Sequence, residues 1–345
     1  MTDEGNFSPP YRPLFVTAFV DWLFSRPIPV WLIFTLTIVV LGGGQHLYAW
    51  NSGALPVGTI NPDLALSSLW VITALVLWHH MTYGAGKTID QYQPYLAMNE
   101  REFSEVRFRF TNIASGIGTI LILSGTWFGI QAARADIEVA PAIQYLVPQI
   151  RFTIWILSNA LFMPLGFQLL RQAQIMRSVY LRADQIDLFN LHPLFGFSQY
   201  VALGGGLVFF QSVVLPLAIN PTAYGVAENL FFGVTSAMAT LGVFFYSLWG
   251  VNRQLIGKKR QILTEVNSKI EAMFQRIHSA FETENYTEIT GMRTMLSALQ
   301  DEKAAIQVVR TWPWEPGTLS WLVSALLIPL LVTFLRDYIS KLLNP

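Results

Sequence analysis

The chain has 345 residues, of which 52% are hydrophobic and 13% charged, and its 22 basic residues balance its 22 acidic residues. About a quarter of the residues in a soluble domain are charged, so this composition excludes an ordinary soluble protein. The zero net charge gives no reason to expect nucleic acid as a partner. Zero cysteines exclude disulfides, thiolate metal sites and thiol nucleophiles. The chain is therefore expected to be an all-α polytopic membrane protein.

The N-terminal segment, residues 1–27, is expected to remain on the chain, because it begins with acidic residues where a signal peptide is basic. Within it, Leu14–Phe24 is an apolar stretch that is too short to cross a bilayer, which predicts a helix in the cytoplasmic interface. Pro27 and Pro29 would separate this helix from the first span. The alternative is a buried extension of that span.

Seven apolar stretches reach the length of about 20 residues that a membrane-spanning helix needs. They are Pro29–Trp50, Leu64–Tyr83, Asn112–Ala132, Arg151–Leu170, Phe197–Ile219, Asn229–Trp249 and Leu319–Ile339. The first six form the expected transmembrane domain, residues 28–250, and the seventh lies in residues 317–345. Most basic residues fall in alternate connecting segments, so the positive-inside rule predicts a cytoplasmic N-terminus and an outside C-terminus.

Residues 251–316 form the expected cytoplasmic module, because Lys, Glu, Gln and Arg replace the apolar residues there. Apolar positions three and four residues apart predict two helices with coiled-coil seams that pair as an antiparallel hairpin. These positions are Leu263, Val266, Ile270, Met273, Ile277 and Phe281, then Ile289, Met292, Leu296, Leu299 and Ile306. The hairpin is interpreted as an assembly or anchor domain, and the alternative is a solvated connector between two spans.

Three observations argue against an enzyme or an ion-coupled carrier. The sequence Gly84-Ala85-Gly86-Lys87-Thr88 resembles the end of a phosphate-binding loop, but Met81 stands where that motif needs a glycine. Lys87 is therefore interpreted as a membrane-surface anchor, and the adjacent His79 and His80 as an interfacial polar pair. No predicted span places an acidic or basic residue near its centre, where carriers and pumps commonly need one. No catalytic, cofactor-binding or metal-binding residues are predicted.

Polar side chains within the spans supply the candidate ligand pocket. Hydroxyl and amide side chains at helical spacing usually hold membrane helices together. The alternative is that they line a pocket for a small molecule, with Asn159, Gln211, Ser236 and Thr240 as the candidates. Both interpretations stay open.

The seventh span is the candidate pore helix. Its pore candidates are Ser320, Val323, Ser324, Leu327 and Leu331, which would give a mostly apolar constriction. Glu228, at the outer end of the sixth span, and Glu315, at the inner end of the seventh, are candidates for charged rings in an oligomer. Each is equally compatible with a helix cap or a surface charge.

Two resemblances accompany these residues. The segments Ile186–Leu194, Trp312–Leu319 and Leu326–Leu330 resemble signatures of uncharacterised prokaryotic integral membrane proteins, which implies a prokaryotic cytoplasmic membrane and no particular function. The ground plan is similar to that of insect olfactory and gustatory receptor channels in its seven spans, inside N-terminus, short outside loops and cytoplasmic helical extensions. This second resemblance implies a tetramer with a cation pore lined by the seventh span. It is one of topology, so no pore residue is carried over.

The leading hypothesis is therefore a homo-oligomeric, ligand-gated cation channel whose partners are the lipid bilayer, further copies of the chain and a small molecule. The competing hypotheses are a membrane scaffold or sensor that does not conduct, and a carrier or lipid-handling protein.

Overall fold

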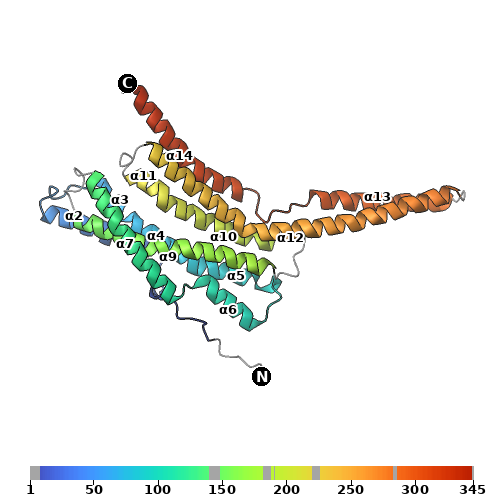
Figure 1. Ribbon diagram of the computed structural model, residues 1–345, viewed down its shortest axis with the longest axis horizontal. Coiled ribbons are helices and arrows are strands. Elements are labelled where there is room, and N and C mark those ends of the chain that lie inside the picture. Colours follow the sequence, from blue (N-terminus) through green and yellow to red (C-terminus); the bar gives the residue numbers. More distant parts are fainter. Residues whose placement is uncertain are drawn as a thin grey trace.

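The computed structural model describes residues 8–139, 148–181, 188–189, 191–219, 226–282 and 286–343. These residues are almost entirely helical, and an isolated β-bridge between Pro13 and Ala114 is their only extended pairing. Figure 1 shows a helical bundle from one end of which a two-helix hairpin projects. We call this end of the bundle the hairpin end. The predicted all-α fold is confirmed.

The elements have the following bounds. They are α1 (Phe15–Phe24), α2 (Val30–Asn51), α3 (Pro62–Ser67), α4 (Leu69–His79), the π-helix η1 (His80–Gly84), α5 (Ala85–Tyr92), the 3-10 turn η2 (Gln93–Tyr95), α6 (Glu100–Thr111), α7 (Ser115–Val139), α9 (Pro148–Leu181), α10 (His192–Phe209), the π-helix η3 (Phe210–Val214), α11 (Leu215–Ile219), α12 (Val226–Glu282), α13 (Tyr286–Val308) and α14 (Thr318–Leu343).

Six helical stretches among the described residues are long and apolar enough to cross a membrane. They are Trp31–Asn51, Ser115–Arg134, Phe152–Val179, Leu194–Leu217, Leu230–Glu282 and Thr318–Arg336. The predicted second span, Leu64–Tyr83, is also helical, but it is divided between α3, α4 and η1. Its helical hydrogen bonding changes at Ser68 and again at His80, so no single regular helix covers its length. Seven spans and the orientation of the termini stay predictions.

The interior of the bundle is a layer of aromatic and aliphatic side chains between α5, α6, α10, α12 and α14. Its largest fully buried members include Tyr92, Phe110, Phe197, Phe209 and Phe244. Phe110 and Tyr92 both contact the ring of Phe197 edge-on, with centroids 6.3 and 5.0 Å away. This aromatic layer joins elements that lie far apart in the sequence.

Helices α7 and α9 approach each other closely because glycines face the contact. A Cβ atom at Gly125 would lie 2.4 Å from the main-chain oxygen of Asn159, and one at Gly129 would lie 2.8 Å from the Cα of Ile156. Because glycine has no side chain, the main chains of the two helices come into direct van der Waals contact here.

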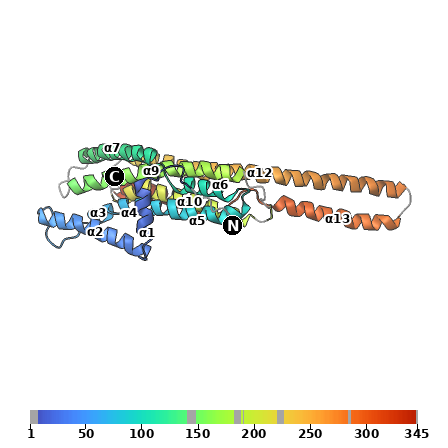
Figure 2. The same cartoon turned by 90° about the horizontal axis from the view of Figure 1, so that it is seen from below.

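Helix α1 lies across the bundle, as Figure 2 shows. Its N-terminal end is fixed by a main-chain hydrogen bond of 2.9 Å from the amide of Leu14 to the carbonyl of Ile113. Leu14 and Val20 are fully buried, whereas Phe15 and Trp22 are 68% and 52% exposed. An apolar face that remains exposed on a helix of ten residues is typical of a helix in the membrane interface.

Helix α12 continues for 57 residues from the bundle into the hairpin, where α13 lies beside it (Figures 1 and 2). Val266, Ile289 and Ile306 are buried between the two helices, while Phe281 is 54% exposed. The Lys259 ammonium donates hydrogen bonds of 2.7 and 2.8 Å to the carbonyls of Gln307 and Val309, which have no amide partners at the end of a helix. Residues 283–285, which connect α12 to α13, lie outside the described residues.

An aromatic cluster joins the hairpin to the bundle. The rings of Trp312 and Trp314 stack with centroids 4.5 Å apart, and Trp314 also contacts Phe244 and Phe245 of α12. The segment between α13 and α14 is thereby packed on α12.

The α7–α9 contact gives the first prediction. Gly125→Ala adds a methyl group against the main chain of Asn159, so the helices must separate, and overpacking of this kind costs about 1–3 kcal/mol. We expect a clear decrease in the melting temperature in detergent. Gly116→Ala on the same helix is the matched control, because its Cβ meets no atom within 4 Å. Equal melting temperatures for the two variants would contradict the close contact.

Candidate functional site

A cleft of about 660 Å³ opens at the hairpin end of the bundle, between α1, η1, α5 and α6. Two carboxylates, two cationic side chains, two hydroxyl groups of threonine, two amides and a phenol line it. The lining residues are Asp21, Thr82, Tyr83, Gly86, Lys87, Asp90, Gln91, Arg107, Thr111 and Asn112. A cleft of this volume accommodates a small molecule or a lipid headgroup.

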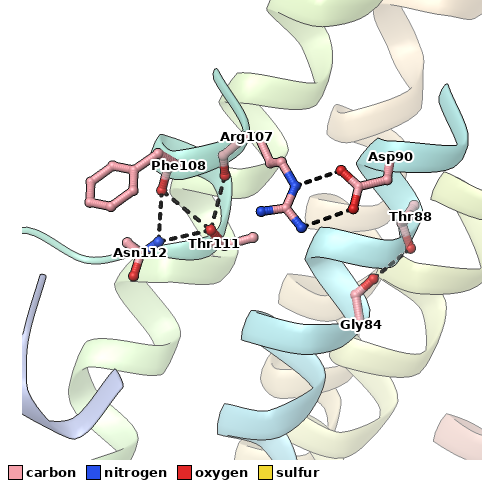
Figure 3. Close-up of polar contacts among 7 residues, drawn as sticks. All are labelled: Gly84, Thr88, Asp90, Arg107, Phe108, Thr111 and Asn112. Carbon is pink, nitrogen blue, oxygen red and sulfur yellow. Dashed lines mark hydrogen bonds and ion pairs between the residues drawn. The ribbon is translucent and has the colours of Figure 1, made fainter. Parts of the chain in front are cut away.

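The wall formed by η1 and α5 has an irregular start. The π-helical turn widens the main chain at His80–Gly84, and such turns within α-helices are frequent at functional sites. Regular helix resumes at Ala85, and the Thr88 hydroxyl donates a hydrogen bond of 2.8 Å to the Gly84 carbonyl (Figure 3). Gly86 is buried beneath Arg107, and a Cβ atom at Gly86 would lie 3.4 Å from the guanidinium Nη2.

Arg107 and Asp90 form an ion pair that joins α6 to α5. The guanidinium Nε donates to one carboxylate oxygen at 2.5 Å and Nη2 donates to the other at 2.9 Å (Figure 3). These hydrogen bonds raise the pKa of Arg107 above its ordinary value. Both oxygens of Asp90 are thus occupied, and the two charges neutralise each other.

The end of α6 forms the floor of the cleft. The side-chain amide of Asn112 donates to the Thr111 hydroxyl at 2.9 Å, and the Thr111 hydroxyl donates to the Arg107 carbonyl at 3.0 Å (Figure 3). Arg171 of α9 donates to the Asn112 carbonyl at 3.1 Å and to the hydroxyl of Tyr11 at 2.7 Å. These bonds satisfy carbonyls at a helix end and fix its position.

Asp21 and Lys87 supply the other two charges of the cleft. Among the described residues, neither side chain forms an ion pair. Desolvation by the surrounding protein raises the pKa of Asp21 above its ordinary value, although its side chain still reaches solvent. The cleft therefore has one unpaired charge of each sign and no net charge.

A buried hydrogen-bond network lies behind the cleft and centres on Gln172 of α9. Its amide nitrogen donates to the carbonyls of Met81 in η1 and Phe110 in α6, at 2.9 and 2.8 Å. Its amide oxygen accepts a hydrogen bond of 2.7 Å from the Tyr200 hydroxyl. The Tyr200 carbonyl in turn lies 3.0 Å from Nε2 of His80. One side chain thus connects four elements.

The four candidate pocket residues belong to three different helix contacts. Asn159 lies at the α7–α9 contact and donates to the Trp155 carbonyl at 2.8 Å. Gln211, in η3, is buried and lies 3.3 Å from the Ser158 hydroxyl. Thr240 is buried against Gly205 of α10, and Ser236, also on α12, is partly buried. The two cavities described above and below are lined by other residues.

Four of the five pore candidates lie on the exposed side of α14. Ser320, Ser324, Leu327 and Leu331 are exposed, whereas Val323 is partly buried. Of the ring candidates, Glu315 accepts a hydrogen bond of 2.6 Å from the Gln199 amide. The side chain of Glu228 lies outside the described residues.

Sequence reasoning missed the cleft because its residues come from segments that are far apart in the chain. Lys87 was recognisable only as a surface cation, and Asp90 and Arg107 become partners only when α5 meets α6. A usable signal did exist for the buried network. Gln168 and Gln172 lie four residues apart at the end of an apolar stretch, and both donate to the Phe110 carbonyl at 2.8 Å.

Comparisons with known proteins give no relatives from which to transfer a function. No family model matches the sequence, and no curated protein or solved structure matches the chain. Both resemblances described above stay predictions.

The Gln172 network gives the second prediction. Gln172→Leu removes the donor for the Met81 carbonyl and the acceptor for the Tyr200 hydroxyl, and each buried polar group without a partner costs about 1–3 kcal/mol. The Phe110 carbonyl keeps its hydrogen bond from Gln168. We expect a large decrease in the melting temperature. Gln174→Leu, at an exposed position of the same helix, should change it little. Similar values for the two variants would show that the network is not important for stability.

The raised pKa of Asp21 gives the third prediction. An aspartate with a raised pKa destabilises the folded state once the pH exceeds its ordinary pKa of about 4, because folding then desolvates a charge. Asp21→Asn should therefore increase the melting temperature at pH 7, and the increase should shrink as the pH falls toward 4. The variant leaves the other charged groups of the cleft, Lys87, Asp90 and Arg107, in place, so the difference in melting temperature reports on Asp21 alone. Asp301→Asn on α13 is the control, and a pH-independent difference would contradict the desolvation.

Proposed function

We propose that the chain is a channel-like membrane protein that assembles with copies of itself, with α14 facing the axis of the assembly and cations passing along it. The observation that carries this proposal is the sparse packing of α14. Only 17% of the most apolar part of Thr318–Arg336 is buried, compared with 50% of the most apolar part of Leu194–Leu217, which contains most of α10. In Figure 1 its C-terminal half projects away from the bundle.

The two sides of α14 differ in a way that supports this arrangement. Leu322, Leu326 and Leu330 face the bundle and are buried. On the other side Ser320, Ser324, Leu327 and Leu331 are all exposed, and they follow one another at spacings of four, three and four residues. This is the spacing of a seam between packed helices.

The chemistry of this exposed stripe suits a symmetric axis. Serines allow helices to approach closely and to hydrogen-bond to one another in a membrane. Leu327 and Leu331 would then form an apolar constriction of the kind that gates by dewetting or by movement. Glu315 lies before the first turn of α14, where it would place a ring of negative charge at the hairpin end.

A groove on the hairpin offers a second surface for self-assembly. It has a volume of about 420 Å³ and lies between α12 and α13, lined by Lys269, Ala272, Met273, Arg276, Met295, Ala298, Leu299 and Glu302. The groove has basic and acidic side chains beside apolar ones. In a symmetric pair of hairpins, basic groups of one copy could face acidic groups of the other, so this surface can complement a second copy of itself. A tetramer is the subunit number that the topological resemblance to insect receptors favours.

The same proposal places the hairpin in the cytoplasm. Basic residues are frequent in the hairpin, and the positive-inside rule puts such segments on the cytoplasmic side, here of a prokaryotic membrane. The N-terminal segment and the cleft would face the same side, and the C-terminus would lie outside.

A lipid-handling or sensory role is the second candidate function. The interfacial cleft with its two unpaired charges favours it, because a cleft of this kind is not needed for conduction through α14. A monomer that retains lipid during purification and conducts no ions would place this alternative first.

The arrangement of α14 gives the fourth prediction. Since the chain contains no cysteine, Ser324→Cys introduces a single thiol on the exposed side of α14. If copies of α14 meet at an axis, oxidation in native membranes should produce a disulfide-linked dimer, because a disulfide needs Cα atoms within about 7 Å. Ser124→Cys, on the exposed side of α7, should stay monomeric. A monomer in lipid nanodiscs, without cross-linking, would overturn the assembly.

A flux assay tests conduction separately. In vesicles that contain the protein, Leu327→Ser should increase cation flux, because a hydroxyl group at a constriction lowers the barrier to wetting. Leu123→Ser, at a residue of α7 that is 63% exposed, is the matched control. Assembly without flux in any variant would favour a scaffold.

A further inference from the structure

We propose that the interfacial cleft binds a phosphoethanolamine group, carried as the headgroup of a phospholipid, with the ammonium at Asp21 and the phosphate at Lys87. This inference goes beyond channel function and does not depend on it. It rests on the position of the cleft, on the pairing of its charges and on its hydrogen-bond donors.

The position of the cleft fits a lipid headgroup. Helix α1 forms one wall and exposes Phe15, Phe19 and Trp22 at 68%, 51% and 52% of their surface. Trp22 also lies beneath the guanidinium of Arg26, whose carbon is 4.9 Å from the ring centroid. Aromatic and basic side chains together are typical of the interface between headgroups and acyl chains. The cleft therefore lies at headgroup depth.

The pairing of charges selects a zwitterion. Arg107 donates to both oxygens of Asp90, so this pair neutralises itself. Among the residues that the structure describes, Asp21 and Lys87 are then the charges of the cleft that form no ion pair, one of each sign. An anionic lipid would neutralise Lys87 and leave Asp21 without a cation. A headgroup that carries a phosphate and an ammonium satisfies both residues.

The carboxylate distinguishes a primary ammonium from choline. A primary ammonium donates up to three hydrogen bonds, whereas the trimethylated nitrogen of choline donates none. Asp21 is partly desolvated in the cleft, so a donor that restores its hydrogen bonds contributes more than a bare positive charge. Phosphatidylethanolamine should therefore bind better than phosphatidylcholine.

Further donors on the opposite wall complement a phosphate. Figure 3 shows that the one guanidinium nitrogen of Arg107 that Asp90 does not hold points toward Thr111. Lys87 lies one residue after the buried Gly86, which packs against the guanidinium of Arg107. Hydrogen bonds from a guanidinium or an ammonium to a phosphate are stronger than hydrogen bonds between neutral groups.

Native mass spectrometry of the full chain tests this site. Protein released from nanodiscs with equal amounts of phosphatidylethanolamine, phosphatidylcholine and phosphatidylglycerol should retain phosphatidylethanolamine preferentially. Asp21→Asn should reduce the preference over phosphatidylcholine roughly tenfold, the effect expected for the loss of a hydrogen bond to a charged group. Lys87→Gln should reduce retention of all three lipids, because each contains a phosphate, and Lys87→Arg should restore it.

The controls separate this site from unspecific charge effects. Asp301→Asn and Lys303→Gln make the same chemical changes on α13 and should leave the lipid preference unchanged. Melting temperatures show whether each variant is folded, and Lys87→Arg provides a folded variant with the charge kept. Equal retention of phosphatidylglycerol, or an unchanged preference in Asp21→Asn, would overturn the proposal.

A soluble competitor distinguishes the two sources of the headgroup. Phosphoethanolamine added to delipidated protein should bind far more weakly than the lipid, because only the lipid also contacts the exposed apolar face of α1. Soluble phosphoethanolamine that binds as tightly as the lipid would overturn the assignment to a phospholipid.

Discussion

The arrangement of the hairpin end depends on a single constraint, that main-chain carbonyls buried at helix irregularities need donors. The π-helical turn of η1 changes the hydrogen-bond spacing from four to five residues, and the Met81 carbonyl is bonded by Gln172. The end of α6 presents the Phe110 carbonyl to the same side chain. Because one amide holds both, η1 and α6 keep a fixed separation, and the cleft between them has fixed walls. Tyr200 completes the network by orienting that amide from α10.

The cleft and α14 lie on different sides of the molecule. Figure 1 places α6 on one side of α10 and α12, and α14 on the other. A lipid in the cleft and a second copy at α14 would therefore occupy separate surfaces. The aromatic layer around Phe197 and Phe244 lies between them, so the two sides are linked through packed side chains.

The sequence predicts the helices well and their ends less well. Apolar length alone identifies the first span, expected at Pro29–Trp50 and found as α2, Val30–Asn51. It does not reveal that α12 continues past Trp249, because a change to charged residues marks where a helix leaves apolar surroundings, not where its hydrogen bonds stop. The π-helical turns have no local pattern, since they depend on tertiary partners such as Gln172. The cleft was beyond sequence reasoning for the same reason, because Arg107 meets Asp90 only through the packing of α6 on α5.

The continuity of α12 has a mechanical consequence. A helix of 57 residues is about 85 Å long at a rise of about 1.5 Å per residue, and the same rod is both part of the bundle and one arm of the hairpin. Rotating such a rod by about 5° around its end in the bundle sweeps the other end through about 7 Å, by the geometry of that length. The Lys259 hydrogen bonds attach α13 to this helix, and Trp312 and Trp314 contact Phe244 and Phe245 on it, so the second arm follows the first. Small tilts of the apolar part of α12 are therefore magnified into displacements of about 7 Å at the far end of the hairpin.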